Sequence, residues 1–428
     1  MILTNARILT FDAADRVVDN GAVEICADGT VGQALWPVNP RPSPDVIDCR
    51  GKLLMPALIN CHTHLYSTLA RGIALPGPAP RNFTEILKKL WWRLDRALNE
   101  EDVYYSALVG LIDSAKNGVG TAIDHHSSPN TCAGSLDVIA RAYRKVGLRG
   151  ATCYETTDRN GRRSAQAGIR ENIRFIERAR PGALVGAAFG LHASFTLSDR
   201  TLRTCVEANQ SLHAGFHVHV AEDRCDSGAV RRLAELGVLD ERTLAAHSIH
   251  VSAAERATLA RLGVNVIHNP QSNCNNAVGI ANLPDLFRRG VNVGLGSDGY
   301  SPRLWEEFKT AIHLQKVRSR DPRAASADAY AAAFLNNRAI VKKVWGFDIG
   351  RIETGARADL LLADYFPPTP IHPGNLFGHL LFGIANAPVE ALMVDGRWVV
   401  RDRRCVNVDE RRVAQKAAVR AKALWERF

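Results

Sequence analysis

The sequence predicts an α/β protein in which a (β/α)8 TIM barrel carries a small composite β-sandwich module made from the N- and C-terminal segments. Eight short apolar runs, each ending in polar residues, and helical periodicity over stretches of about 20 to 35 residues between most of them predict the barrel. Strand-like segments at both ends of the chain predict the module. The 428 residues are too many for one minimal domain and fit one barrel with an added module.

The eight apolar runs are rich in Val, Ile, Ala and Gly, as expected of buried parallel strands. Because the active site of such a barrel lies at the carboxyl ends of its strands, the polar residues that end the runs are the candidate site. The runs and their polar ends are 57–61 with His62 and His64, 120–123 with Asp124, His125 and His126, 148–154 with Glu155, 184–191 with His192, 216–221 with Glu222, 243–246 with His247, 264–267 with His268 and Asn269, and 291–296 with Asp298.

The stretches between the runs have the pattern of amphipathic helices. Residues 135–146 place apolar side chains on one face, and residues 252–262 begin with a Ser252 and Glu255 capping box and stop at Gly263. This alternation of strand and helix is typical of parallel βα units.

The two ends of the chain have strand patterns, and no helix is evident in the N-terminal segment. We expect strands at 2–11, 17–25 and 46–54, and again at 359–363, 389–394 and 397–400, where Asp395-Gly396 indicates a hairpin. Between them we expect a loop at Pro37, Pro40, Pro42 and Pro44. The predicted domains are therefore 1–55 plus 346–428 for the composite β-module and 56–345 for the barrel.

Composition excludes several classes of protein. With 46% hydrophobic and 23% charged residues the chain is not a disordered protein, and its apolar stretches fall far short of the roughly 20 residues of a membrane span. The net charge of +10 is spread along the chain, so we expect no nucleic-acid partner and no membrane partner. The first residues lack the pattern of a secretory signal, and we expect a cytoplasmic protein.

Histidine pairs predict a metal site. His62 and His64 lie two apart on a strand and therefore on one face, as do His217 and His219. With His247 and the strand-end Asp298 they suit a borderline divalent cation such as Zn²⁺ or Fe²⁺, with one position left open for water.

Glu222 follows His219 by three residues and has two interpretations. Its side chain either lies over the metal pocket and transfers protons, or it caps the next helix.

These motifs, in this order and spacing, resemble the amidohydrolase superfamily, and within it the aminohydrolase branch with the cytosine, guanine and adenosine-type deaminases and the triazine hydrolases. The resemblance covers nearly the whole chain. Segments 90–98, 123–126 and 155–160 are similar to the SsnA-like aminohydrolases, from which the chain departs by having Thr63 rather than Asn within its first His-x-His motif. The motifs are His62-Thr63-His64 with Arg71-Gly72, His219-x-x-Glu222, His247, His268-Asn269-Pro270-x-Ser272-Asn273 and Ser297-Asp298-Gly299.

The resemblance implies a metal-dependent deaminase. Binuclear members use a carboxylated Lys at a strand end, and no Lys ends any of the eight runs, so we expect one divalent ion per chain, zinc first and iron as the alternative. Its ligands would be His62, His64, His219 and Asp298, and the catalytic residues Glu222, His247 and Asp298.

The implied reaction is the release of ammonia from a nitrogen heterocycle of purine, pterin or pyrimidine type. The alternatives are hydrolysis of a cyclic amide or of a triazine C–Cl or C–N bond, and a catalytically silent metal-binding scaffold. The family is commonly oligomeric, and we expect a homodimer.

We expect the small heterocyclic substrate to contact the strand ends at His125, Glu155 and His192. These residues have the alternative role of satisfying loop backbone groups. After a loop at 76–80 that could form a lid, one of Trp91 and Trp92 would stack on the ring, and we choose Trp92. Asn273 is the fifth candidate, with the alternative that it only shapes a turn.

Overall fold

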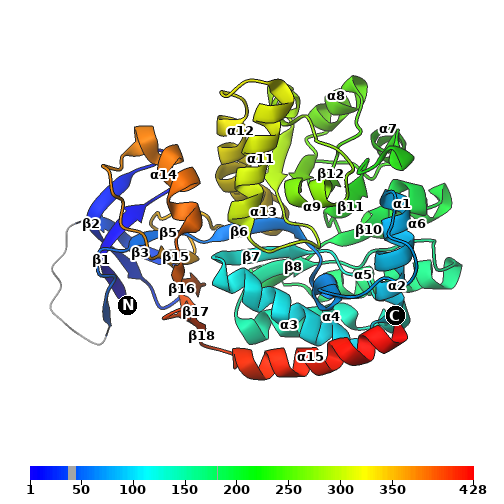
Figure 1. Ribbon diagram of the computed structural model, residues 1–428, viewed down its shortest axis with the longest axis horizontal. Helices are drawn as coiled ribbons and strands as arrows, with labels where there is room; N and C mark the ends of the chain where they lie inside the picture. Colours follow the sequence, from blue (N-terminus) through cyan, green and yellow to red (C-terminus); the bar gives the residue numbers. More distant parts are fainter. Residues whose placement is uncertain (37–44, 181) are drawn as a thin grey trace.

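The computed structural model describes residues 1–36, 45–180 and 182–428. It divides into a strand-rich part that contains the N-terminus and a larger barrel surrounded by helices (Figure 1). The expected loop at Pro37, Pro40, Pro42 and Pro44 lies outside the described residues.

The barrel has eight strand positions arranged in two parallel arcs, which confirms the predicted fold class. The fourth position is interrupted at Ala188, so that one piece of it pairs with each arc. The first arc contains β6 (Leu58–Thr63), β7 (Val119–Asp124), β8 (Arg149–Thr152) and β9 (Val185–Ala187), and the second contains β10 (Phe189–Ala193), β11 (Phe216–Val220), β12 (Leu244–His247), β13 (Asn265–His268) and β14 (Asn292–Leu295).

The arcs meet without a regular ladder. Isolated parallel bridges join Thr63 to Asp298 and Thr156 to Leu191. Between β6 and β14, Asn337 takes over the pairing: its amide donates to the carbonyls of Ile59 at 2.6 Å and Leu295 at 2.9 Å, and its oxygen accepts from the Leu295 amide. A helix side chain therefore satisfies backbone groups that a ladder would otherwise pair.

Helices cover the outside of the barrel, as the periodicity predicts. The capping box of Ser252 and Glu255 is present, and the helix predicted at 135–146 has these bounds in the structure. The covering helices are α3 (Glu100–Lys116), α4 (Ser135–Val146), α5 (Arg162–Arg178), α6 (Asp199–Asn209), α7 (Ala229–Glu235), α8 (Ala253–Arg261), α10 (Leu283–Arg288), α11 (Leu304–Ser319), α12 (Ser326–Tyr330) and α13 (Asn337–Trp345).

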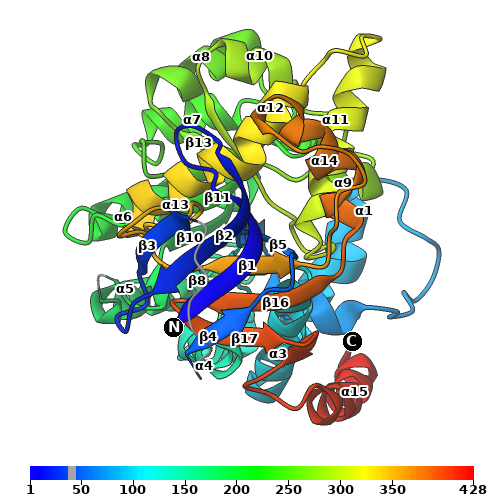
Figure 2. The same ribbon diagram turned by 90° about the vertical axis from the view of Figure 1, so that its left-hand side faces the viewer.

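Both ends of the chain contribute to one nine-stranded sheet, shown face-on in Figure 2. The N- and C-terminal halves join where β5 pairs antiparallel with β15. The expected strand at 46–54 is two strands, β4 and β5, and β3 and β18 are additional. The strands are β1 (Ile2–Leu9), β2 (Val17–Ile25), β3 (Val31–Trp36), β4 (Val46–Asp48), β5 (Leu53–Pro56), β15 (Leu360–Ala363), β16 (Val389–Val394), β17 (Arg397–Arg401) and β18 (Arg404–Cys405).

An ion pair links the barrel to this sheet. Arg149 of β8 donates to Asp359 at 2.8 and 3.1 Å and to Asp395 at 2.9 Å. Arg149 and Asp359 are both buried. The sheet therefore meets the barrel through a bonded charge cluster at the amino end of the barrel strands.

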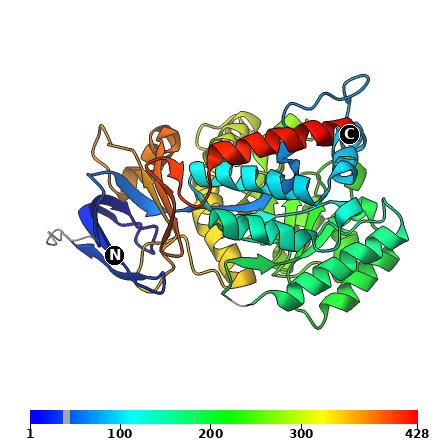
Figure 3. The same ribbon diagram turned by 90° about the horizontal axis from the view of Figure 1, so that it is seen from below.

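The C-terminal helix α15 (Glu410–Arg427) follows the sheet in sequence but lies along α3 of the barrel (Figure 3). Arg420 donates to the buried Asp102 at 3.0 Å, and Arg427 pairs with the same carboxylate. The Trp425 indole donates to the Leu69 carbonyl at 2.8 Å, next to the first loop of the barrel. The helix thus braces the loop that follows β6. A shorter helix, α14 (Leu376–Phe382), lies between β15 and β16 in sequence.

Candidate metal centre and active site

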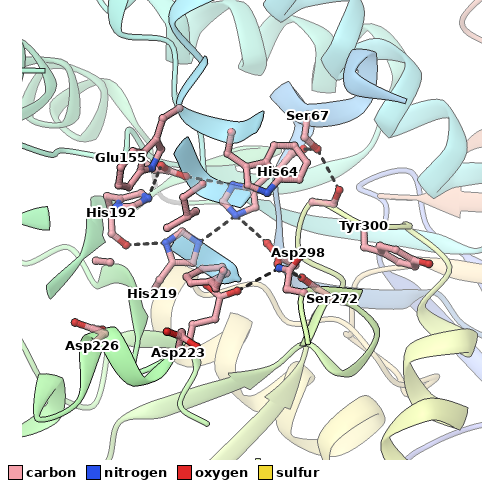
Figure 4. A pocket seen from close by; sticks show the side chains of 18 of the residues that line it. His64, Ser67, Glu155, His192, His219, Asp223, Asp226, Ser272, Asp298 and Tyr300 are labelled. Atoms are coloured by element: carbon pink, nitrogen blue, oxygen red, sulfur yellow. Dashed lines mark hydrogen bonds and ion pairs between the residues drawn. The ribbon is translucent and has the colours of Figure 1, made fainter. Parts of the chain in front are cut away.

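The carboxyl ends of the barrel strands bring together the histidines and the aspartate selected from the sequence (Figure 4). Nε2 of His64 lies 3.1 Å from Nε2 of His219 and 2.9 Å from Oδ1 of Asp298. Nε2 of His62 lies 3.4 Å from the same Asp298 oxygen. Three imidazole nitrogens and one carboxylate oxygen therefore converge on one point.

Hydrogen bonds on the far side of each ring define which nitrogen faces this point. Nδ1 of His64 donates to the His125 carbonyl at 2.6 Å, and Nδ1 of His219 donates to the His192 carbonyl at 2.7 Å. Nδ1 of His62 lies 2.8 Å from Nε2 of His217. In neutral rings so bonded, the Nε2 atoms carry lone pairs.

This arrangement fits a bound cation. Two Nε2 lone pairs 3.1 Å apart repel each other, and Nε2 of His62 is buried with no hydrogen-bond partner among the described residues. One divalent ion satisfies all four acceptor atoms at once, whereas a proton satisfies only one pair. The outer hydrogen bonds are of the kind that orient metal-ligating histidines.

The protonation states also suit a metal. Burial lowers the pKa of His62 to about 4 and holds the pKa of His219 well below its ordinary value, so both rings are neutral. Burial also acts to lower the pKa of His64, but Asp298 and Glu155 raise it well above the ordinary value, so a bound cation would replace a proton on this ring. Burial acts to raise the pKa of Asp298, but the adjacent imidazoles of His62 and His64 hold it well below the ordinary value. Neutral imidazoles and an ionised carboxylate are the metal-binding forms.

His247 lies beside this group in a strained conformation. Its φ is +70° and that of Asp298 is +55°, both in the left-handed region that costs a non-glycine residue free energy. Nδ1 of His247 donates to the Asn273 side chain at 2.8 Å, so its Nε2 is an acceptor, 3.5 Å from Glu222 and 3.9 Å from Oδ2 of Asp298. Strain of this kind is typical of functional sites, where the surroundings hold it in place.

Glu222 is buried at the same place and does not cap a helix. The short helix that follows it is capped by Asp223, whose side chain accepts from the Cys225 amide, and α7 has Gly228 at its cap. Burial raises the pKa of Glu222 to about 7, and Asn276 donates to it at 3.4 Å. A carboxyl with this pKa exchanges a proton near neutral pH.

A cavity opens above these residues. One wall is the helical segment of α1 (Phe83–Ile86), a π-helical turn at Leu87–Trp91 and α2 (Trp92–Ala97), which presents both tryptophans. Phe195 and Tyr300 are exposed parts of its lining. Of the five predicted substrate contacts, Trp92, Glu155 and His192 line the cavity.

His125 and Asn273 are not among the lining residues, which corrects the expectation that they contact substrate. His125 is fully buried behind the metal ligands, where Nε2 donates to the His217 carbonyl at 3.1 Å and the ring stacks on His217. Asn273, in α9 (Pro270–Asn275), orients His247. Both are therefore supports of the proposed ligand and catalytic side chains.

Several polar lining residues were not selected from the sequence as substrate contacts, among them the following four. Ser272 of α9 bonds to Oδ2 of Asp298, and Asn276 bonds to Glu222. Arg159 and Asp226 also line the cavity. The resemblance motifs included the Ser272 and Arg159 segments, and that signal could have identified these two.

Within the described ranges 1–36, 45–180 and 182–428, no helix has the length and apolar character that a membrane crossing requires.

Comparison with known proteins identifies the family of this chain. Residues 53–399 match the model of the amidohydrolase family. A 5-methylthioadenosine/S-adenosylhomocysteine deaminase of Desulforudis audaxviator is 32% identical over 89% of each chain, and a 5'-deoxyadenosine deaminase of Methanosarcina mazei is 31% identical over 100% of this chain and 99% of its own. An adenosine deaminase of Xanthomonas campestris, solved with bound zinc, superposes with a TM-score of 0.87 at 23% identity over 99% of this chain and 98% of its own, which supports the fold. The chain therefore belongs to the amidohydrolase family, hydrolases that act on carbon–nitrogen bonds.

Proposed function

We propose that this protein is a metal-dependent aminohydrolase that releases ammonia from a nitrogen heterocycle of purine, pterin or pyrimidine type. The observation that carries the proposal is Glu222, a buried carboxyl with a pKa of about 7, within 3.5 Å of His247 and beside the convergent histidines. Adding water across a ring C=N bond needs an acid at the ring nitrogen, and Glu222 is suitably placed. The deaminase names of the two relatives support the same class of reaction.

One divalent ion per chain, zinc first and iron as the alternative, would be held by His62, His64, His219 and Asp298. When bound, such an ion would lower the pKa of water to about 7 and so supply a nucleophile at neutral pH. The zinc in the solved adenosine deaminase supports the choice of metal.

The side chains divide the proton transfers between them. Asp298 turns Oδ2 towards His247 and accepts the proton of the attacking water, while Nε2 of His247 accepts a hydrogen bond that orients the water. Glu222 donates its proton to the ring nitrogen next to the carbon under attack. As the C–N bond to the amino group breaks, Asp298 passes the water proton to the leaving amine, and Glu222 takes back a proton from the hydroxyl on the attacked carbon. Amine and water thus become carbonyl and ammonia, with both carboxyl groups restored.

The proposed substrate-binding residues are Trp92, Glu155 and His192. The Trp92 ring lies 6.4 Å from the His192 ring and offers a flat apolar face to a heterocycle. Nδ1 of His192 bonds Thr196 at 2.8 Å, and Thr196 in turn donates to the Ala193 carbonyl, so Nε2 of His192 is an acceptor for a substrate N–H. Glu155 adds a buried carboxylate oxygen with no hydrogen-bond partner among the described residues.

Ammonia release from a panel of purines, pterins, pyrimidines and their nucleosides tests the proposal. We expect turnover of at least one heterocycle by the metal-loaded protein. Ring opening of cyclic amides, or release of chloride or alkylamine from triazines, without ammonia from the panel would replace deamination by those alternatives. No turnover of any of these compounds by the metal-loaded protein would favour the silent scaffold.

Location in the cytoplasm, assembly as a homodimer and the division into 1–55 plus 346–428 and 56–345 stay predictions. Cell fractionation, the mass in solution and expression of the separate barrel segment would test them in turn.

A further inference from the structure

Arg159 lies in the loop after β8 and lines the cavity. Its side chain is only 8% exposed, and its guanidinium lies 5.1 Å from the centre of the Trp92 ring. Nη2 donates to Oδ2 of Asp95 at 2.6 Å. Nε and Nη1 are buried, and no acceptor within the described ranges bonds to either of them.

Asp95 fixes Arg159 from behind. This carboxylate is 1% exposed, does not line the cavity, and also accepts from Ser127 at 3.2 Å. Because a guanidinium stays protonated and cannot accept hydrogen bonds, Nε and Nη1 can be satisfied only by an acceptor. With protein acceptors absent on that side, the cavity is where an acceptor would come from.

The charge around the cavity limits what this acceptor is. Arg159 is the one Lys or Arg among the described lining residues, and Asp95 already neutralises it. The lining carboxyl groups are Glu155, Glu222, Asp223, Asp226 and Asp298. A carboxylate or phosphate on the substrate would face these groups, whereas an uncharged oxygen would not be repelled by them.

We propose that Arg159 determines the specificity of this site by donating to an uncharged oxygen of the substrate, on the part that lies beyond Trp92 and His192 from the metal centre. The inference rests on the proposed deaminase function and narrows its substrates to neutral heterocycles that carry such an oxygen. Two sources share this chemistry, a ring carbonyl as in guanine and a sugar hydroxyl as in adenosine. Adenine has neither group.

Two variants and one control isolate this contact. Arg159→Gln alone leaves Asp95 as an unpaired buried carboxylate and risks the fold, so the informative variant is Asp95→Asn with Arg159→Gln, in which two neutral amides can still bond each other. The control is Arg174→Gln, because Arg174 also pairs with a buried carboxylate, Glu171, but does not line the cavity. Melting temperatures verify that each variant is folded.

The measurements are kcat/KM for ammonia release and, on a Glu222→Gln background, the rise in melting temperature with adenine, guanine, adenosine and AMP as probes. We expect the parent protein to prefer guanine or adenosine over adenine, and adenosine over AMP. The double variant should lose about 10- to 100-fold for the preferred oxygen-bearing probe, the cost of one hydrogen bond to a charged group, and keep its value for adenine. A loss of binding and turnover for guanine indicates that Arg159 contacts a ring carbonyl. The same loss for adenosine indicates that it contacts a sugar hydroxyl.

The outcomes separate this inference from the proposed function. If the parent protein binds the oxygen-bearing probes and the double variant does not, but none releases ammonia, then the deaminase proposal fails and the role of Arg159 stands. Equal losses for adenine and the preferred probe, no loss at all, a preference for AMP, or no probe binding to the parent protein would each overturn the inference.

Discussion

The two ends of the barrel hold buried charged and polar groups in opposite ways. At the amino end of the strands, Arg149 is bonded to Asp359 and Asp395, and Asp359 also accepts from the Asp395 amide at 2.8 Å. At the carboxyl end, Nε2 of His62, Nε2 of His247 and Oε1 of Glu155 have no hydrogen-bond partner among the residues described.

This contrast distinguishes buried polar groups that stabilise the fold from buried polar groups that bind a ligand. A buried charge whose hydrogen bonds are complete is part of the scaffold, because removing one partner strands the other. Several acceptors and donors that are buried together without partners are stable only if something from outside completes them. The amino end therefore joins the barrel to the sheet, and the carboxyl end is the proposed binding site for metal and substrate.

The largest effect should come from breaking the chemistry at the carboxyl end. Glu222→Gln preserves shape and cannot donate the proton, so ammonia release should fall by about 10²- to 10⁴-fold. Metal content and melting temperature should not change, since Glu222 is outside the proposed ligand set. Turnover close to that of the parent protein would mean that Glu222 is not the acid.

At the amino end, replacing a buried carboxylate should lower the stability of the protein and leave the rate of ammonia release unchanged. Asp359→Ala removes two of the three hydrogen bonds of the buried Arg149 and leaves it only Asp395, so it should cost about 2 to 3 kcal/mol of unfolding free energy. The melting temperature reports this loss, and kcat/KM of the folded fraction should stay constant. A matched control is Asp321→Ala, which removes an exposed ion pair with Arg323 and should leave the melting temperature unchanged. Equal melting temperatures for both variants would contradict the comparison.

Much of this contrast is readable from the sequence, because the residues that end parallel strands meet at one face. Alternation along a strand places His62 with His64 and His217 with His219, and the structure has both pairs on common faces. Alternation does not say how far a strand-end side chain reaches. His125 was expected at the cavity and instead stacks behind on His217, and Asn273 reaches His247 rather than the cavity.

Contacts that depend on distant segments were not predictable. The role of Asn337 as a substitute for strand pairing needs α13 to lie across the seam of the barrel, which no local pattern encodes. Arg159 is one basic residue in a loop until Asp95, 64 positions away, fixes it. The strands β3 and β18 were not predicted, because they form by pairing with neighbours in the sheet rather than through a pattern of their own.

Removing the metal from the carboxyl end should have a smaller effect, which the melting temperature measures. A chelator should lower the melting temperature of the parent protein, since a ligand present at 100 times its Kd stabilises by about 2.7 kcal/mol. The variant His64→Ala, with a broken ligand set, should show a low melting temperature that the chelator does not lower further. A parent protein that is insensitive to the chelator while remaining active would argue against the metal centre.

The smallest effect should be that of pH on turnover. The pKa of Glu222 is raised by burial to about 7, so its acid form, present below that pH, is lost as the pH rises. If Glu222 donates the proton, kcat/KM should fall above pH 7 by about tenfold per unit. The residual activity of Glu222→Gln should lack this decline. A rate that rises across the same interval would contradict the donor role.

The proposal that each chain holds one catalytic metal ion is tested by titrating zinc into metal-free protein while measuring ammonia release from the best substrate of the heterocycle panel. We predict that activity rises linearly with added zinc and reaches its maximum at one zinc per chain. The residues His62, His64, His219 and Asp298 should each be required. Activity that needs two ions per chain, or that is full without metal, would contradict it.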